Sequence, residues 1–181
     1  MGKGRQFFKL KVEEQVPNDP RLLQVMLFQS EQCWAYAMDL RQILSNNSSA
    51  SERIKAHIKQ KLKRAHKWAL KLDQLCRERS TQSTAQESKA YSNFMEGLVH
   101  HEYKRFQFAL RSYITSRQIY VELMKVSDTL KSVLYKEKIE QLDQSIRYCY
   151  QKTNESMFDS IEKILEKYKS ETKLGELNAN H

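Results

Sequence analysis

Five lysines recur at intervals of four residues on a stretch that also keeps a helical apolar pattern. They are Lys55, Lys59, Lys63, Lys67 and Lys71. Side chains four residues apart lie on neighbouring turns of an α-helix, so the row extends over about 24 Å at 1.5 Å per residue. Each adjacent pair of lysines repels by roughly 0.2–0.5 kcal/mol. A surface built only for solubility would mix its charges, so the row indicates a surface that meets an anion.

The positive charge of the chain is concentrated in two segments. The 181 residues carry 31 Lys and Arg against 22 Asp and Glu, a formal net charge of +9. Residues 51–79 hold ten basic and three acidic residues, and residues 1–11 hold four basic residues and no acid. A phosphate backbone neutralises such local charge and releases counterions. The pattern favours nucleic-acid binding, and the alternatives are a solvated face or an acidic lipid or protein partner.

Other cations extend this candidate phosphate-binding set. The basic stretch also contains Arg53, Lys61, Arg64, Arg77 and Arg79. The N-terminal segment adds Lys3, Arg5, Lys9 and Lys11. Between these cations lie Phe7 and Phe8, which either stack on unpaired RNA bases or fix the arm to a helical body. Trp68, at the edge of the apolar stripe, is expected in the core.

Catalytic and metal-binding chemistry finds no support in the residue spacing. The histidines are His57, His66, His100, His101 and His181. They form no HExxH motif and no Asp/Glu-x-x-His pair. Glu102 follows His101 directly, but adjacent helical side chains point about 100° apart. A Gly-rich phosphate loop and a Cys-x-x-Cys pair are also missing from the sequence, so we expect a non-enzymatic protein without a metal or cofactor.

The cysteines and the apolar runs indicate a soluble intracellular protein. Cys33, Cys76 and Cys149 are far apart and occupy helical apolar positions, which is typical of buried reduced thiols. The N-terminal segment has no apolar run of the kind found in a secretory signal. No window approaches the roughly 18 apolar residues of a membrane-spanning helix.

The composition predicts an all-α protein, since the chain has four Gly and two Pro and is rich in helix-forming residues. The apolar period indicates about six helices with short links, so neighbouring helices should be antiparallel. The first begins at Pro20 and keeps its apolar stripe to Ile43, and the second follows a polar linker at 45–51. The others are expected at about 84–102, 104–124, 128–151 and 154–170. The expected divisions are a basic irregular arm at 1–16, a helical domain at 17–173 and a polar tail at 174–181.

Residues 91–117 carry small and aromatic residues at the spacing of a tetratricopeptide helix pair. Ala109 follows Gly97 by twelve residues, Tyr113 comes four residues later, and Ser116 three residues after that. In such a pair, small residues let two helices approach closely and the aromatic ring fills the gap between them. An ordinary helical hairpin is the alternative.

Three longer stretches carry a family resemblance. They are "CWAYAMDL" (33–40), "AYSNFMEGLVHHEYKRFQFALRSYITSRQIYVEL" (90–123) and "SIRYCYQ" (145–151). Their order and spacing resemble the N-terminal RNA-binding domain of the sixty-eight-kilodalton protein family of the eukaryotic signal recognition particle. The chain departs from the family pattern at Ala35, where serine is typical, and at Gln144 and Ser145, which replace Pro-Asn.

The resemblance implies a tetratricopeptide-like domain that binds signal recognition particle RNA at a three-way junction and bends it. It places the particle in the cytoplasm, with assembly in the nucleolus, and its task in co-translational targeting to the endoplasmic reticulum. It also implies a larger tetratricopeptide partner subunit, bound through a C-terminal region absent from this chain, and an arginine-rich helix preceding "MGKGRQFF". Four further cations join the candidate RNA contacts: Lys104, Arg105, Arg111 and Arg117.

Two other functions remain open at the level of sequence. The main one is a tetratricopeptide-like adaptor whose concave groove binds a peptide, and it requires polar contacts within the groove of the 91–124 hairpin. The second is a domain that docks on an acidic membrane, and it requires exposed large apolar residues beside the cations. The basic stretch shows neither arrangement clearly.

Overall fold

The computed structural model describes residues 20–46, 52–153 and 160–169. Five long helices make up most of these residues: α2 (Pro20–Asn46), α3 (Glu52–Arg79), α4 (Gln82–Glu102), α5 (Phe106–Val126) and α6 (Thr129–Thr153). A shorter helix follows at 161–169. Within the described ranges there are helices and turns and no strand, which confirms the predicted all-α class.

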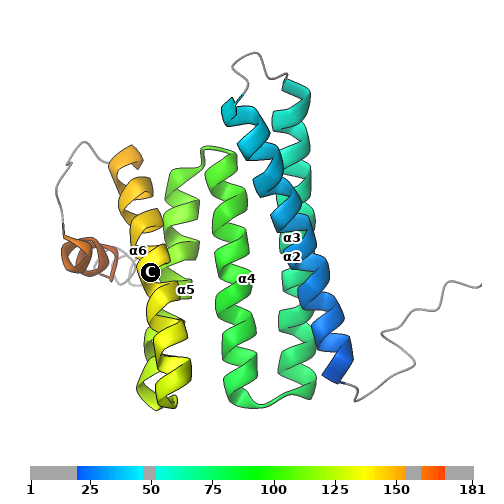
Figure 1. The fold of residues 1–181 in the computed structure, drawn as a ribbon. Helices are drawn as coiled ribbons and strands as arrows, with labels where there is room; N and C mark the ends of the chain where they lie inside the picture. The colour runs from blue at the N-terminus through cyan, green and yellow to red at the C-terminus, as the bar shows by residue number, and fades with distance from the viewer. Residues whose placement is uncertain (1–19, 47–51, 154–159, 170–181) are drawn as a thin grey trace, which may run out of the picture.

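The helices stand side by side in chain order. Figure 1 shows α4 in the middle of the array, with α2 and α3 on one side and α5 and α6 on the other. Links of two or three residues join α3 through α6, so successive helices run antiparallel. Each helix packs mainly against its neighbours in the sequence. This is the arrangement of a tetratricopeptide-like array, as predicted.

The pair formed by α4 and α5 has the close approach that its small residues predict. A Cβ atom at position 97 would lie 2.4 Å from Cε1 of Tyr113, so only glycine fits there. Tyr113 and Ala109 are fully buried. Ser116 donates a hydrogen bond of 2.8 Å to the carbonyl of Ala90 on α4. The tetratricopeptide-like reading of this hairpin is therefore confirmed.

Most of the predicted inward residues are buried, and Ile43 is the exception. Its side chain is 50% exposed near the end of α2, because Leu40 and Leu44 take the inward positions of the last turns and pack against the core. Trp68 packs against the core, as expected. The polar linker was predicted at 45–51, but α2 continues to Asn46, and residues 47–51 lie outside the described residues.

Helix α4 begins two residues earlier than predicted. The side chain of Thr81 accepts a hydrogen bond of 3.3 Å from the backbone N–H of Thr84. This contact satisfies one of the free donors at the start of the helix, so the helix extends back to Gln82.

The three cysteines are free and buried, as predicted. Burial raises the pKa of the Cys149 thiol to about 12, which keeps it protonated and unreactive at neutral pH. None of the helices in the described ranges combines the length and the apolar content needed to cross a membrane.

Candidate nucleic-acid interface

One side of α3 is buried, and the lysine row winds over the rest of its surface. Ile58 and Ala65 are fully buried in a cluster with residues of α2 and α4. Four residues make slightly more than one helical turn, so each step of the row advances by roughly 40° around the axis. The five lysines therefore do not share one face: Lys55 and Lys71, at the two ends, lie on different flanks of the helix.

The ends of the row have local partners. Nζ of Lys55 lies 2.7 Å from Glu52 Oε1, an exposed pair one turn apart. Nζ of Lys71 lies 5.1 Å from the ring centroid of Trp68. Lys63 and Lys67 in the middle of the row are exposed. These two exposed ammonium groups are accessible to an external anion.

Three cations meet at the ring of Tyr103, in the link between α4 and α5. Nζ of Lys63 lies 4.8 Å from the ring centroid and Nζ of Lys59 lies 5.3 Å from it. The guanidinium carbon of Arg105 lies 5.7 Å from the same centroid. The electron-rich ring face attracts each cation by about 0.5–1 kcal/mol at an exposed site. We call Lys59, Lys63, Tyr103 and Arg105 the Tyr103 cluster.

The link that carries the cluster has an unusual backbone. The N–H of Arg105 donates to the carbonyl of His100 and the N–H of Lys104 donates to that of His101, both at 2.9 Å. These two bonds form a Schellman motif, whose left-handed position normally holds glycine. Here it holds Lys104, with φ of 56°, the one non-glycine residue of the described chain with positive φ. A lysine in this conformation costs about 1–2 kcal/mol relative to the right-handed region.

The start of α5 is also locally unfavourable. Arg105 occupies the N-cap position and makes no capping hydrogen bond through its side chain, whereas Ser, Asp or Asn would stabilise the helix by about 1 kcal/mol there. Lys104 and Arg105 thus hold two positions where uncharged or acidic residues are more stable. Two consecutive cations thus stand at positions that the local backbone does not favour.

Five other predicted RNA contacts on α3 and α5 lie in different places. Arg53, Arg64 and Arg111 are exposed. Lys61 is turned toward α2, where its Nζ lies 4.4 Å from the ring centroid of Tyr36. Arg117 lies about 18 Å along α5 from Arg105 at 1.5 Å per residue. Its Nε is 2.5 Å from Asp143 Oδ1 on α6, so this guanidinium joins two helices and is not brought to the cluster.

Two histidines near the cluster add little charge at neutral pH. Burial lowers the pKa of His66, on α3. Burial and, secondly, the nearby Arg41 lower the pKa of His101, whose ring stacks on Tyr148 at 5.0 Å. Arg41 itself makes a 2.6 Å ion pair with Glu102, which ties α2 to the end of α4. The positive charge beside Tyr103 therefore comes from lysine and arginine.

Tyr103, whose ring lies closest to these cations, was not among the residues predicted from the sequence. Its signal was present in the string Tyr103-Lys104-Arg105, since an aromatic beside cations was the argument used for Phe7 and Phe8. No local sequence pattern shows that Lys59 and Lys63 of α3 lie close to the ring of Tyr103. The four N-terminal candidates lie outside the described residues: Lys3, Arg5, Lys9 and Lys11.

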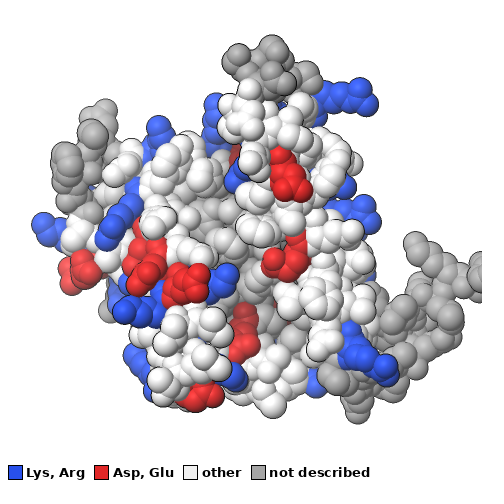
Figure 2. Space-filling view, viewed as in Figure 1, with Lys and Arg blue, Asp and Glu red and all other residues white. Residues whose placement is uncertain are grey.

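No group of three or more His, Cys, Asp or Glu side chains is placed to hold a metal ion in residues 20–46, 52–153 and 160–169. Figure 2 shows a central hollow with acidic side chains on both sides of it, and with Lys and Arg beside some of these acids as well as at the edges of the view. Acidic groups repel phosphates, so this hollow suits a phosphate backbone less than the Tyr103 cluster does.

Comparison with known proteins gives a consistent family. The family described as RNA-binding signal recognition particle 68 matches residues 1–180. The signal recognition particle subunit SRP68 of Dictyostelium discoideum is 31% identical over 172 residues, 89% of this chain and 27% of the relative. The subunit of the same name from Drosophila melanogaster is 31% identical over 150 residues, 82% of this chain and 24% of the relative. The chain thus spans about a quarter of the length of these relatives.

A solved structure shares the fold. The SRP68-RBD from Chaetomium thermophilum superposes with a TM-score of 0.69 at 23% identity. The match covers 81% of this chain and 75% of the other. The helical array described above is therefore the fold of that domain.

Proposed function

Because the chain belongs to the RNA-binding signal recognition particle 68 family, we propose that it binds the particle RNA through α3 and the α4–α5 link. The observation that carries this proposal is the convergence of Lys59, Lys63 and Arg105 on the ring of Tyr103. The ring offsets part of the repulsion among the three cations and fixes their positions. A positioned group of cations spends less side-chain entropy when it meets phosphates than three free side chains would.

The chemistry of this surface suits the backbone of a structured RNA. Lysine and arginine neutralise phosphates without reading sequence, and recognition of folded RNA rests on shape and backbone contacts. Lys67, Lys104 and Arg111 extend the surface on its exposed side. Arg117 is omitted because Asp143 already engages it. The chain acts in this proposal as a scaffold and performs no reaction.

The finer part of the proposal follows from the family. The chain binds a three-way junction of the particle RNA, bends it there, and so supports co-translational targeting to the endoplasmic reticulum from the cytoplasm. The N-terminal cations Lys3, Arg5, Lys9 and Lys11 add phosphate contacts. The family also implies a larger partner subunit, which in this proposal binds through a C-terminal region of the full-length protein.

Replacing the lysines of α3 tests the interface directly. In a variant with Gln at Lys55, Lys59, Lys63 and Lys67, we expect weaker binding to the junction RNA. The slope of log K against log salt should fall by roughly 0.7–0.9 for each lysine that contacts a phosphate. Stability should hold or rise slightly, since Gln keeps most of the apolar stem and relieves the repulsion.

A second variant separates location from total charge. It carries Gln at four exposed lysines outside the surface: Lys89, Lys131, Lys136 and Lys163. Both variants lose the same charge, so only the first should lose affinity and salt dependence strongly. Equal losses would show that net charge alone drives binding, and an unchanged first variant would remove α3 from the interface. End-to-end fluorescence transfer on the same RNA reports the bending.

A further inference from the structure

Phe108, in the first turn of α5, is 58% exposed. Phe106, two residues earlier, packs against the core, whereas none of the core clusters of the described residues includes Phe108. Single exposed apolar residues are common on protein surfaces, so the exposure alone does not indicate a site. What surrounds the ring decides whether it has a partner.

The ring of Phe108 stands among cations of the proposed RNA interface. Residues three apart are neighbours on a helix surface, so Arg105 lies one turn before the ring and Arg111 one turn after it. Both arginines are exposed, and Arg105 also belongs to the Tyr103 cluster. An open aromatic ring with a guanidinium group on each flank is therefore continuous with the cationic surface.

Residues of α4 lie against the ring and fix its place. The ring centroids of Phe108 and His100 are 5.5 Å apart, with 31° between the ring planes. One acid is also near: Glu96 Oε2 accepts a hydrogen bond of 3.0 Å from the hydroxyl of Ser112, and its Oε1 lies 3.9 Å from Nε2 of His100. Both carboxylate oxygens thus have polar neighbours within the protein, which moderates their repulsion of a phosphate.

Phe28 of α2 offers a comparison within the same chain. It is 66% exposed, so its ring is as open to water as that of Phe108. The positions three and four residues away hold Gln24, Val25, Glu31 and Gln32, so no cation of its own helix flanks it. The combination of an open ring and flanking cations thus distinguishes Phe108 from an ordinary exposed phenylalanine.

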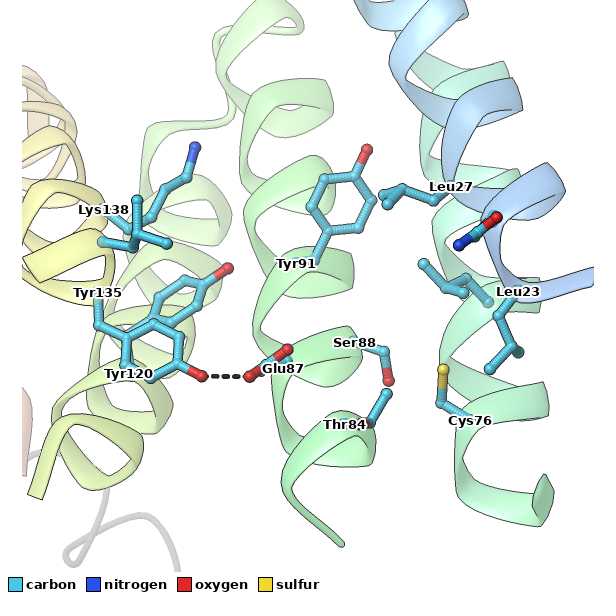
Figure 3. Close-up of a pocket in the computed structure, with 13 residues that line it drawn as sticks. Leu23, Leu27, Cys76, Thr84, Glu87, Ser88, Tyr91, Tyr120, Tyr135 and Lys138 are labelled. Carbon is cyan, nitrogen blue, oxygen red and sulfur yellow. Dashed lines mark hydrogen bonds between the residues drawn. The ribbon is translucent and has the colours of Figure 1, made fainter. Parts of the chain in front are cut away.

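The tyrosines of the groove along α4 have a different task. Figure 3 shows Tyr91 of α4 and Tyr135 of α6 in the lining of this groove. The hydroxyl of Tyr135 donates to Glu87 on α4, and the hydroxyl of Tyr91 lies 2.6 Å from Glu31 Oε1 on α2. These hydroxyls hold neighbouring helices together. Phe108 has no hydroxyl, so its open ring has no such task.

We propose that an unpaired base of the bound RNA stacks on the ring of Phe108. Arg105 and Arg111 then meet phosphates on either side of that nucleotide. Every base has a π-face, so an aromatic platform adds affinity without reading sequence, and unpaired bases occur at junctions and loops of a folded RNA. This inference rests on the proposed function, whose contacts are to phosphates, and adds a contact to a base.

Two RNAs test the stacking with the whole chain: the three-way junction of the particle RNA and a fully paired duplex of the same length. Phe108→Leu keeps an apolar side chain and removes the ring. It should bind the junction about tenfold more weakly and bind the duplex like the parent. The slope of log K against log salt should stay the same for both RNAs, because no charge is lost.

Two further variants serve as controls. Phe108→Tyr keeps the ring and should bind both RNAs like the parent. Phe28→Leu removes an equally exposed ring and should change neither affinity. All three variants should keep the helical circular dichroism of the parent, because both phenylalanines are exposed.

Removal of the unpaired bases of the junction, one at a time, identifies the stacked base. One abasic position should weaken binding of the parent chain about tenfold and should not weaken binding of Phe108→Leu any further, since the two changes remove the same contact. If no position depended on Phe108 in this way, the proposal would be overturned.

Parental affinity of Phe108→Leu for the junction would also overturn it. An equal loss on the junction and the duplex would do the same, because the ring would then contact a feature that both RNAs share. The variant with Gln at Lys55, Lys59, Lys63 and Lys67 separates this failure from that of the proposed function. If it loses affinity for both RNAs while Phe108→Leu does not, the interface stands and only the stacked base is wrong. If both variants bind like the parent, the proposed function fails as well.

Discussion

Two regions differ in how they hold their charged groups. One is the Tyr103 cluster, and the other is a groove along α4 that is lined by Tyr91, Tyr120 and Lys138 among others. In the cluster, one ring gathers Lys59, Lys63 and Arg105, and like charges stay close together. In the groove, each carboxylate accepts a hydrogen bond from a tyrosine that reaches it from a neighbouring helix. The first arrangement leaves its charge available to an outside partner, whereas the second uses its charge to brace the fold.

Within the same helical array, the cluster cations are thus available to a partner, whereas the groove carboxylates hold neighbouring helices together. Helix α4 takes part in both regions, since the groove uses its residues from Thr84 to Met95 and the cluster lies just beyond its end. The Arg41–Glu102 pair ties the last turn of α4 to α2. A change in how α4 packs should therefore disturb both regions, while a change in the α4–α5 link should affect only the cluster.

The largest expected effect comes from Gly97, because it sets the distance between α4 and α5. Replacement by Val would place side-chain atoms inside the ring of the fully buried Tyr113. Overpacking of this kind costs about 1–3 kcal/mol or more. We expect a lower urea midpoint and weaker RNA binding together, because α4 supports both the groove and the link that carries the cluster.

The matched control for Gly97 is Ser83→Ala, at an exposed position of the same helix. It should change the free energy of unfolding by no more than about 0.5 kcal/mol. If Gly97→Val were as stable as the parent chain, the close approach of α4 and α5 would not be needed. The shared dependence of the two regions on α4 would then be wrong.

The next effect comes from Tyr103 and should separate the two regions. In Tyr103→Leu, the three cations lose the ring that gathers them, each contact being worth about 0.5–1 kcal/mol. We expect RNA affinity to fall about fivefold to tenfold, with the urea midpoint unchanged, because the groove and the core do not use this ring. Tyr103→Phe keeps the ring and should bind like the parent. A fall in affinity for the Phe variant would mean that the hydroxyl, and not the ring face, matters.

The helices of this fold could be predicted from the sequence because their signals are local. Apolar residues at helical spacing identify the buried faces, and Gly97 with Tyr113 identifies a close helix pair. Ile43 was wrongly predicted to face the core, because the apolar spacing continues through the last turns of α2. In the structure, Leu40 and Leu44 make the core contacts of these turns. Periodicity does not show where a neighbouring helix stops providing contacts.

The candidate site could be predicted only in part, because its geometry depends on distant residues. A count of charges located the basic helix, but it could not show which cations are already engaged. Arg117 meets Asp143 from another helix, and Lys61 turns toward Tyr36 on α2. Tyr103 lies where cations of α3 and of the α4–α5 link meet. Such partners are set by the packing of the array, which a linear pattern does not contain.

The smallest expected effect, at Lys104, tests whether the link gives up stability for charge. Lys104 occupies the left-handed position of the Schellman motif, with φ of 56°. Glycine relieves a cost of about 1–2 kcal/mol there and adds back some chain entropy, so Lys104→Gly should raise the free energy of unfolding by about 0.5–1 kcal/mol. The same variant loses one exposed cation and should bind RNA about twofold to fivefold more weakly.

Lys104→Ala separates the two consequences of that change, because it removes the charge and keeps a side chain in the strained conformation. It should lose as much RNA affinity as Lys104→Gly and gain no stability. Urea denaturation measures the stability of each variant, and titration into the junction RNA measures the affinity. The lysine is kept for its charge if Lys104→Gly gains stability and loses RNA affinity while Lys104→Ala only loses RNA affinity. If both variants bound RNA like the parent, the strained backbone at Lys104 would have no connection with the interface. The contrast between the cluster cations, which are available to RNA, and the groove carboxylates, which hold helices together, would then rest on the Tyr103 variants alone.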